Sequence, residues 1–269
     1  MSTEICIVKR RFSSRLLPPL MVFAVAVGGW YLLAYSLDNN FASADGSPLI
    51  IPPPHMLFDG VNATTAGQIA EATLISAGTA FVGLIFAGVV GVLLGVAMSS
   101  SKSVESAIWP WLVAVQVTPI IVLTPIIVRV VGPSFEARVL VTVLIAFFPV
   151  ASNALYGLRA VPQAFHDLCS LAGFSKWRRL LQVQLPSATP AIFAGVRVAA
   201  GLSVIGAIVG DFFFTRGTPG LGRLVTMYFQ DTRSGPMFVT ALVASIVGLA
   251  FFMLVSFLRR LFVSPWDHS

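Results

Sequence analysis

Long apolar runs alternate with short polar stretches along most of the chain. Each of six runs holds about 20 residues, the length that an α-helix needs to cross the hydrocarbon of a bilayer. We therefore expect an all-α transmembrane fold with six helices. The expected spans are residues 16–37, 74–98, 107–130, 139–157, 188–212 and 238–258.

One polar stretch, Arg159 to Pro190, separates the fourth and fifth runs and holds four of the 17 Lys and Arg residues. A basic stretch between spans favours the cytoplasmic side of the membrane. Pro162 suits the first turn of a helix, Gly173 suits a helix end, and Ser175 can cap the next helix. We expect two short helices here, the second of which ends at Leu185-Pro186.

The first of these helices carries an apolar stripe. Phe165, Leu168 and Ala172 fall on one face at helical spacing, with Leu171 at its edge. A short helix between spans has no core of its own, so the stripe fits the groove of another protein. An ordinary amphipathic loop that lies on the membrane surface is the alternative.

The same stretch resembles the EAA loop of permease subunits in binding-protein-dependent ABC importers, written E-A-A-x3-G-x9-I-x-L-P. The chain reads Asp167-Leu168-Cys169, then Gly173, Val183 and Leu185-Pro186, and both spacings match. Leu168 and Cys169 stand where the motif has alanine. The resemblance implies a coupling helix seated in a cleft of a separate cytoplasmic ATPase. The implied coupling residues are Phe165, Asp167, Leu168, Cys169, Ala172, Gly173, Leu185 and Pro186.

Composition supports a membrane protein, because 57% of the residues are hydrophobic and only 10% are charged. Soluble domains are about 25% charged. We expect one membrane domain, residues 1–269, with an extra first span at 16–37, a core at 74–260 and a cytoplasmic loop at 159–187. The net charge of +6 reflects basic cytoplasmic loops rather than nucleic-acid binding. The basic residues place both termini in the cytoplasm.

The sequence lacks the motifs of several kinds of binding site and of catalysis. The sequence has no G-x-x-x-x-G-K-[ST] loop, so it should not bind ATP itself. Its three histidines are far apart, and Cys6 and Cys169 both fall on expected cytoplasmic segments. We expect no disulfide, no metal, no cofactor and no enzymatic activity.

The first apolar run has two interpretations. It follows a basic segment, and Ala42-Ser43-Ala44 resembles a signal-peptide cleavage site. A run of about 22 residues exceeds the roughly 7–15 of a signal core, so an uncleaved first span is favoured.

The third span contains Pro110, Pro119 and Pro125. Proline frees backbone carbonyls, and bent helices of transporters often border the pathway. We expect a kinked helix here, with Gln116 and Thr118 next to Pro119 as candidates to face a polar pore. A purely structural kink is the alternative.

Two charged residues occupy the fifth span. Arg197 has two interpretations. Its side chain reaches or pairs toward the cytoplasm, or it lines the pathway. Asp211, at the outer end, either caps an external segment or contacts the substrate or its binding protein. Residues 212–236 are expected to form an external loop. Gly91-x-x-x-Gly95 and Gly206-x-x-x-Gly210 predict close helix packing. The candidate pathway residues are Gln116, Thr118, Pro119, Arg197 and Asp211.

The resemblance implies an ABC importer permease in the inner (plasma) membrane. Ile51-Pro52-Pro53-Pro54 resembles a Leu-Pro-x-Pro segment of the nitrate/sulfonate/taurine branch. The implied partners are an ATPase subunit, a periplasmic or lipid-anchored substrate-binding protein, a second permease copy in a homodimer, and membrane lipid. Sulfonates, taurine, nitrate, a pyrimidine precursor and riboflavin all remain open as substrates. The alternatives are an ATP-independent secondary transporter or channel, and a non-transporting membrane scaffold.

Overall fold

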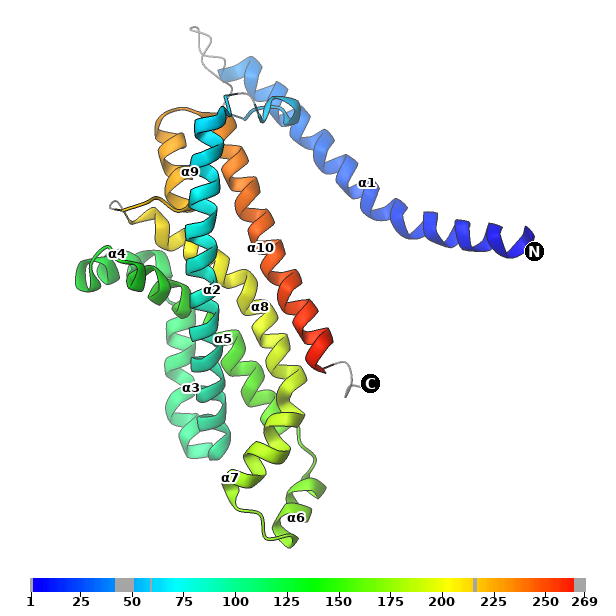
Figure 1. Cartoon of the computed structure of the whole chain (residues 1–269), viewed down its shortest axis with the longest axis vertical. Helices are drawn as coiled ribbons and strands as arrows, with labels where there is room; N and C mark the ends of the chain where they lie inside the picture. Colours follow the sequence, from blue (N-terminus) through cyan, green and yellow to red (C-terminus); the bar gives the residue numbers. More distant parts are fainter. Residues whose placement is uncertain (1, 42–50, 59, 215–216, 264–269) are drawn as a thin grey trace. The chain divides into compact units, whose positions relative to one another are not determined.

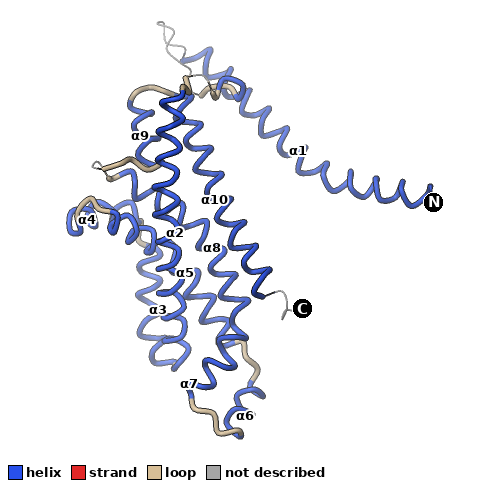
Figure 2. The backbone as a smooth tube through the Cα atoms, in the orientation of Figure 1, coloured by secondary structure: helices blue, strands red, loops and turns tan. Residues whose placement is uncertain are grey.

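The computed structural model describes residues 2–41, 51–58, 60–214 and 217–263, with side chains at 17–36, 51–58, 60–214 and 217–261. This described part consists of helices and loops and has no strand (Figures 1 and 2). Its helices are α1 (Ser2–Phe41), η1 (Pro54–Met56), α2 (Ala63–Ser100), α3 (Lys102–Val117), α4 (Ile120–Val131), α5 (Phe135–Arg159), α6 (Gln163–Leu171), α7 (Lys176–Arg179), η2 (Leu180–Gln184), α8 (Leu185–Phe212), α9 (Leu221–Gln230) and α10 (Ser234–Val263).

Apolar helices of spanning length coincide with five of the six expected runs. They cover Leu17–Ser36, Ala63–Ser100, Phe135–Arg159, Lys176–Phe212 and Ser234–Leu261. The sixth run forms the pair α3 and α4, which meet at an angle of 97°. The expected all-helical membrane fold is therefore confirmed, with five continuous helices of spanning length and one broken pair.

The break in the third span is sharper than the expected kink. Pro119 has no N–H to give to a helix, and its ring disfavours the helical conformation in the residue before it. Thr118 accordingly has an extended backbone, with φ −67° and ψ 124°, and α4 begins after Pro119. Pro110 and Pro125 remain inside α3 and α4.

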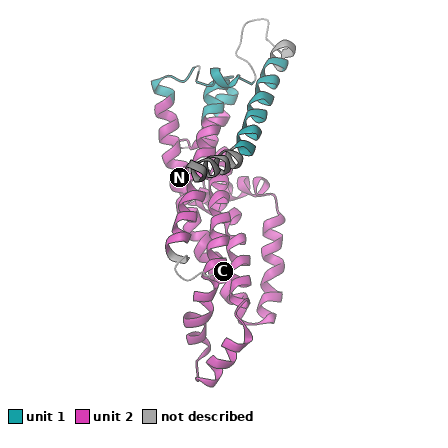
Figure 3. Ribbon diagram, turned by 90° about the vertical axis from the view of Figure 1, so that its right-hand side faces the viewer, with its two compact units in different colours: residues 1–65, 227–239 teal, residues 66–226, 240–269 magenta. Residues whose placement is uncertain are grey.

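Contacts divide the chain into two compact units (Figure 3). The smaller contains residues 1–65 and 227–239, and the larger contains 66–226 and 240–269. Inside the smaller unit, the Trp30 indole N–H donates to the Pro52 carbonyl at 3.1 Å, and its ring lies 6.0 Å from that of Phe238. Ala42-Ser43-Ala44, the cleavage-like site, lies outside the described residues. The expectation of one membrane domain stays a prediction.

In the larger unit, α5 and α8 lie close together because glycine allows it. A Cβ on Gly195 of α8 would lie 2.6 Å from the Pro149 carbonyl oxygen of α5. On the other side of α5, a Cβ on Gly91 of α2 would lie 2.6 Å from Val150. The expected close packing at the Gly91 motif is therefore confirmed, and α5 is the central helix of this unit.

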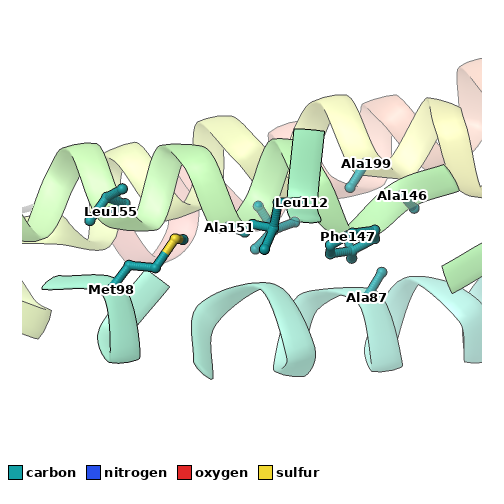
Figure 4. Packing of buried hydrophobic residues seen from close by; sticks show 9 residues of the cluster. Ala87, Met98, Leu112, Ala146, Phe147, Ala151, Leu155 and Ala199 are labelled. Atoms are coloured by element: carbon teal, nitrogen blue, oxygen red, sulfur yellow. The ribbon is translucent and has the colours of Figure 1, made fainter. Parts of the chain in front are cut away.

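The largest apolar cluster fills the space around α5 (Figure 4). Phe147, Val150 and Leu155 of α5 contribute the larger side chains, and Met98 of α2 and Leu112 of α3 pack with them. The remaining members of the cluster are alanines, whose short side chains let the helix backbones approach closely. Packing of small residues is the usual means of holding helices together where lipid offers no hydrophobic contrast.

The segment at 212–236, expected to be an external loop, contains a helix. Leu221–Gln230 form α9, with Leu221, Leu224 and Tyr228 buried on one side. The expectation of a loop was wrong. Glycine, proline and charged residues at the start of the segment suggested a loop, and the helical spacing of the apolar residues that follow was overlooked.

Candidate functional site

The polar stretch between α5 and α8 folds as helix, break and helix. Pro162 precedes α6, which ends at Leu171, and Gly173 has a left-handed backbone with φ 67°. The Phe174 N–H donates to the Cys169 carbonyl at 2.9 Å, and the Gly173 N–H donates to the Ser170 carbonyl at 3.2 Å. These two bonds are the Schellman arrangement that closes a helix on glycine, as expected for Gly173.

The second short helix starts where its cap was expected. The Ser175 hydroxyl accepts a hydrogen bond from the Arg178 N–H at 3.2 Å, which satisfies one free donor of α7. The Arg178 guanidinium lies 4.3 Å from the centre of the Phe174 ring. The cap and this ring contact fix the angle at which the chain leaves Gly173.

The apolar stripe on α6 is not covered by this chain. Phe165 is 53% exposed, Leu168 is 60% exposed and Leu171 is 86% exposed. Asp167 is also exposed, and its carboxylate accepts a bond from Gln163 at 3.1 Å. Cys169 differs, because it is buried and faces its own chain. The helices α6 and α7 project from one end of the bundle that includes α3, α5 and α8 (Figure 1).

The chain does not leave the helix at Leu185-Pro186, so that expectation was wrong. Helix α7 continues through η2 into α8, and one apolar helix runs from Lys176 to Phe212. Within η2 the turn widens to a π-helix, and the Leu185 N–H donates to the Leu180 carbonyl five residues back. This wider turn accommodates Pro186, which lacks an N–H, at the first turn of α8.

An ion pair fixes the base of the polar stretch between α5 and α8. Arg159, the last residue of α5, contacts both carboxylate oxygens of Glu105 on α3, at 2.6 and 2.8 Å. The same guanidinium donates to the Met98 carbonyl of α2 at 3.4 Å. Three spans therefore meet where the polar stretch begins.

The candidate pathway residues of the third span lie at its break. Gln116, Thr118 and Pro119 are all exposed in this chain. The Thr118 hydroxyl donates to the Ala114 carbonyl at 2.7 Å, and the Thr118 N–H donates to the same carbonyl at 3.1 Å. These side chains border the bend, and their place in a pathway stays a prediction.

Asp211 lies at the centre of a buried polar cluster. The Ser76 hydroxyl of α2 donates to its Oδ2 at 2.7 Å, and Nη1 of Arg138 on α5 lies 3.4 Å from its Oδ1. The Leu221 N–H, at the start of α9, donates to the Ser76 hydroxyl at 2.8 Å. Asp211 is 1% exposed.

The same cluster holds the segment that leads into α9. Arg138 donates to the Thr218 carbonyl at 3.3 Å. The guanidinium also lies 5.0 Å from the centre of the Phe214 ring. Asp211 therefore sits at the N-terminus of α9, as a cap for an external segment would. Its contact with substrate stays a prediction.

Sequence reasoning missed two members of this cluster, Ser76 and Arg138. Arg138 lies just before the expected span at 139–157, yet the structure places it inside α5, where it is 7% exposed. A signal was present, since Arg138 and Asp211 are opposite charges near the ends of two consecutive spans. Ser76 gave no such signal, because serine is common in membrane helices.

Arg197 has a different environment from the other arginines of the bundle. Its guanidinium lies 5.2 Å from the centre of the Phe252 ring on α10. Its Nε is buried and has no hydrogen-bond partner among the described residues. The expected pairing toward the cytoplasm is not seen there.

Comparison with known families gives a match over most of this chain. The model of the binding-protein-dependent transport system inner membrane component matches residues 87–264. The chain is 30% identical to the formylaminopyrimidine transport permease protein ThiX of Halalkalibacterium halodurans, over 94% of this chain and 97% of the relative. It is 30% identical to the riboflavin transport system permease protein RibX of Chloroflexus aurantiacus, over 83% of each chain. The nitrate import permease protein NrtB of Synechocystis is 25% identical, over 94% of this chain and 91% of the relative.

Solved structures share the fold. A chain of the inward-facing MetNI methionine ABC transporter superposes with a TM-score of 0.59 at 15% identity, over 72% of this chain and 98% of that chain. A chain of an amino acid ABC transporter crystallised with histidines superposes with a TM-score of 0.59 at 19% identity, over 73% and 95%. At these identities the likeness shows the fold alone.

Proposed function

The chain belongs to the family of inner membrane components of binding-protein-dependent transport systems, and on that premise we propose that it is driven by a separate cytoplasmic ATPase seated on α6. The family makes the chain an ABC importer permease, a multi-pass membrane protein that transports rather than catalyses. We propose, in addition, which partner drives transport, how that partner is coupled to the spans and what kind of cargo is carried.

One observation carries the proposal, namely the uncovered apolar stripe of α6. Phe165, Leu168 and Leu171 lie at the end of the bundle that the basic residues assign to the cytoplasm. Three large apolar side chains on a nine-residue helix are costly to leave in water, and each can recover about 1.5–3 kcal/mol when buried in a groove. The Schellman closure at Gly173 holds the helix in shape before the partner arrives.

The continuous helix from Lys176 to Phe212 supplies the mechanical link. ATP binding closes the two ATPase subunits, and α6 moves with the subunit that holds it. Because α7, η2 and α8 form one helix, a displacement at α7 turns α8 as a rigid arm. The close contact of Gly195 with Pro149 transfers that movement to α5. The spans then alternate between inward- and outward-open arrangements.

Two further partners complete the proposed importer. A second copy of the chain forms the other half of the pathway, and an external binding protein delivers the cargo. Both termini lie in the cytoplasm, in keeping with the distribution of Lys and Arg. Relatives are named for formylaminopyrimidine, riboflavin and nitrate, so we propose a small polar solute as cargo.

An ATP-independent transporter or channel is the competing function. Such a protein has no ATPase to bind, so it would not require the exposed apolar stripe of α6 or its closure at Gly173. It also tends to carry more ionisable groups at membrane depth than this chain does.

The experiment compares two neighbouring substitutions on α6. The chain is co-expressed with the ATPase encoded beside it, and the amount of ATPase that co-purifies is measured. Leu171→Asp places a charge in the stripe, whereas Ser170→Asp places the same charge on the polar face of the same turn. We expect Leu171→Asp to remove most of the ATPase and Ser170→Asp to retain it. Equal retention by both variants would overturn the proposed docking face.

A further inference from the structure

Arg197 lies in the middle of a membrane-spanning helix. It is flanked by apolar turns on both sides within α8, which runs from Leu185 to Phe212. At 1.5 Å per residue, its Cα is about 18 Å along the helix from Leu185. A full positive charge at this position is costly, because hydrocarbon does not solvate it.

The chain offers this charge little compensation. In the described part of the chain, the guanidinium forms no ion pair, and its one cation–π contact is with the Phe252 ring at 5.2 Å. The buried Nε has no hydrogen-bond partner there. By contrast, Arg138 pairs with Asp211 and Arg159 pairs with Glu105. The Nε of Arg138 also lacks a hydrogen-bond partner within the described ranges, so the difference lies in charge compensation: Arg138 and Arg159 have carboxylates, whereas Arg197 has a ring.

A second copy of the chain cannot supply the missing carboxylate at that depth. The acidic residues of the described helices α2, α3, α5 and α8 lie toward the helix ends, and α10 has none. They are Glu71, Glu105, Glu136 and Asp211. A symmetric partner presents the same residues at the same depths. Within these five described helices, a second copy therefore offers Arg197 no carboxylate at its own depth.

The side of α8 next to Arg197 is left open by the chain. Ala194, one turn before Arg197, is exposed, and so is Val198 beside it. An arginine on the border of an open face requires either water or an anion within reach, because hydrocarbon stabilises neither its charge nor its donors. Because Ala194 and Val198 are apolar, it is the charge of Arg197 that favours a polar space over lipid on this side of α8.

We propose that Arg197 is an oxyanion-binding residue of the translocation pathway, and that the cargo presents a carboxylate, sulfonate, nitrate or similar group to it. This inference rests on the proposed function, since it takes the chain as an importer permease. The planar guanidinium provides donors in a fork that fits two oxygens of one oxyanion. The ring of Phe252 holds the guanidinium over its face by cation–π attraction when no anion is present. A lipid phosphate has the same chemistry and is the other source of an oxyanion.

The test measures the reaction of a cysteine introduced next to Arg197 in the full-length chain, held in phospholipid nanodiscs without ATP. The Ala194→Cys variant is exposed to an anionic and to a cationic methanethiosulfonate reagent of similar size, and peptide mapping identifies the labelled thiol. Leu249→Cys, at an exposed apolar position of α10, is the lipid-facing control. We expect the thiol of Ala194→Cys to react, the anionic reagent to be favoured, and the thiol of Leu249→Cys to stay unreacted.

The charge of Arg197 is then changed in the Ala194→Cys background. Arg197→Gln should lower the anionic-to-cationic ratio of rates about tenfold, the size expected for a charge-assisted hydrogen bond. Arg197→Lys should keep most of the ratio. Excess methanesulfonate should slow the labelling of the introduced thiol, whereas neutral dimethyl sulfone of similar shape should not. Size-exclusion profiles confirm that each variant is folded.

The outcomes separate the two sources of an oxyanion. If a lipid phosphate is the partner, the thiol of Ala194→Cys stays unreacted with both reagents and methanesulfonate has no effect, which overturns the proposal. An unchanged ratio in Arg197→Gln also overturns it. Because the assay uses no ATPase, failure of the coupling face on α6 would leave this result unaffected, and the two proposals can fail separately.

Discussion

Arg138 and Asp211 form an ion pair in the interior of the larger unit, with Nη1 3.4 Å from Oδ1 and both side chains almost fully buried. The residues belong to consecutive spans, α5 and α8, and the pair lies beside the N-terminus of α9. Ser76 of α2 and the Leu221 N–H complete the cluster. Four helices are thus connected through one carboxylate.

Removal of either charge should destabilise the protein strongly. Asp211→Leu leaves Arg138 buried without its partner, and Arg138→Met does the reverse. Each should lower the free energy of unfolding by about 3–5 kcal/mol, the usual cost of an uncompensated buried charge. The double variant should recover much of this loss, since no charge is then left alone. Thermal unfolding in detergent measures the effect, and single variants as stable as the wild type would show that the pair is not a structural element.

The ion pair between Arg159 and Glu105 should matter much less for stability. Its distances are shorter, at 2.6 and 2.8 Å, but both side chains are partly exposed. Exposed pairs contribute about 0–1 kcal/mol, because water and salt screen them. We expect Glu105→Gln to shift the melting temperature only slightly, and less at high salt. A loss as large as that of Asp211→Leu would contradict this account of burial as the deciding factor.

Close approach of α5 and α8 should make Gly195 intolerant of a side chain. A Cβ there would lie 2.6 Å from the Pro149 carbonyl oxygen, which belongs to the backbone and cannot turn aside. Gly195→Ala should therefore destabilise the chain by about 1–3 kcal/mol. Gly201→Ala is the matched control, because a Cβ there meets nothing within 4 Å in the same helix. It should be neutral or gain up to about 1 kcal/mol of helix propensity.

Gly173 should tolerate asparagine but not valine. Its φ of 67° strains residues with a branched side chain, whereas asparagine adopts this conformation more readily. Nothing lies within 4 Å of a Cβ at this position, so backbone strain is the only cost. Gly173→Val should weaken association with the ATPase, measured by co-purification, and Gly173→Asn should retain most of it. Equal binding by the two variants would show that the Schellman closure does not shape the docking face.

Much of the fold could be predicted because its causes are local. Apolar runs of spanning length coincide with the helices, and Gly173 and Ser175 end and start helices as their backbone preferences indicate. The stripe of Phe165 and Leu168 follows from helical period alone. These features need no knowledge of distant parts of the chain.

The features that could not be predicted depend on neighbours far apart in sequence. Nothing near Ser76 in the sequence indicates that it meets Asp211, and the opposite charges of Arg138 and Asp211 become one buried cluster with Ser76 only when three spans pack. Pro186 suggested a helix end, because a proline at this place usually interrupts helical hydrogen bonding. The π-turn at Leu180–Gln184 shifts the hydrogen bonds by one residue, so that the helix continues past Pro186. The local sequence does not indicate this shift.

The most direct test of the central claim is uptake by proteoliposomes that contain this chain, its neighbouring ATPase and its binding protein. Formylaminopyrimidine, riboflavin, nitrate and ethanesulfonate serve as radiolabelled or colorimetric probes. We predict ATP-dependent uptake of one of them in the complete system, and none when the ATPase is left out or Leu171→Asp is present. Uptake at the full rate by the permease without any ATPase would contradict the account.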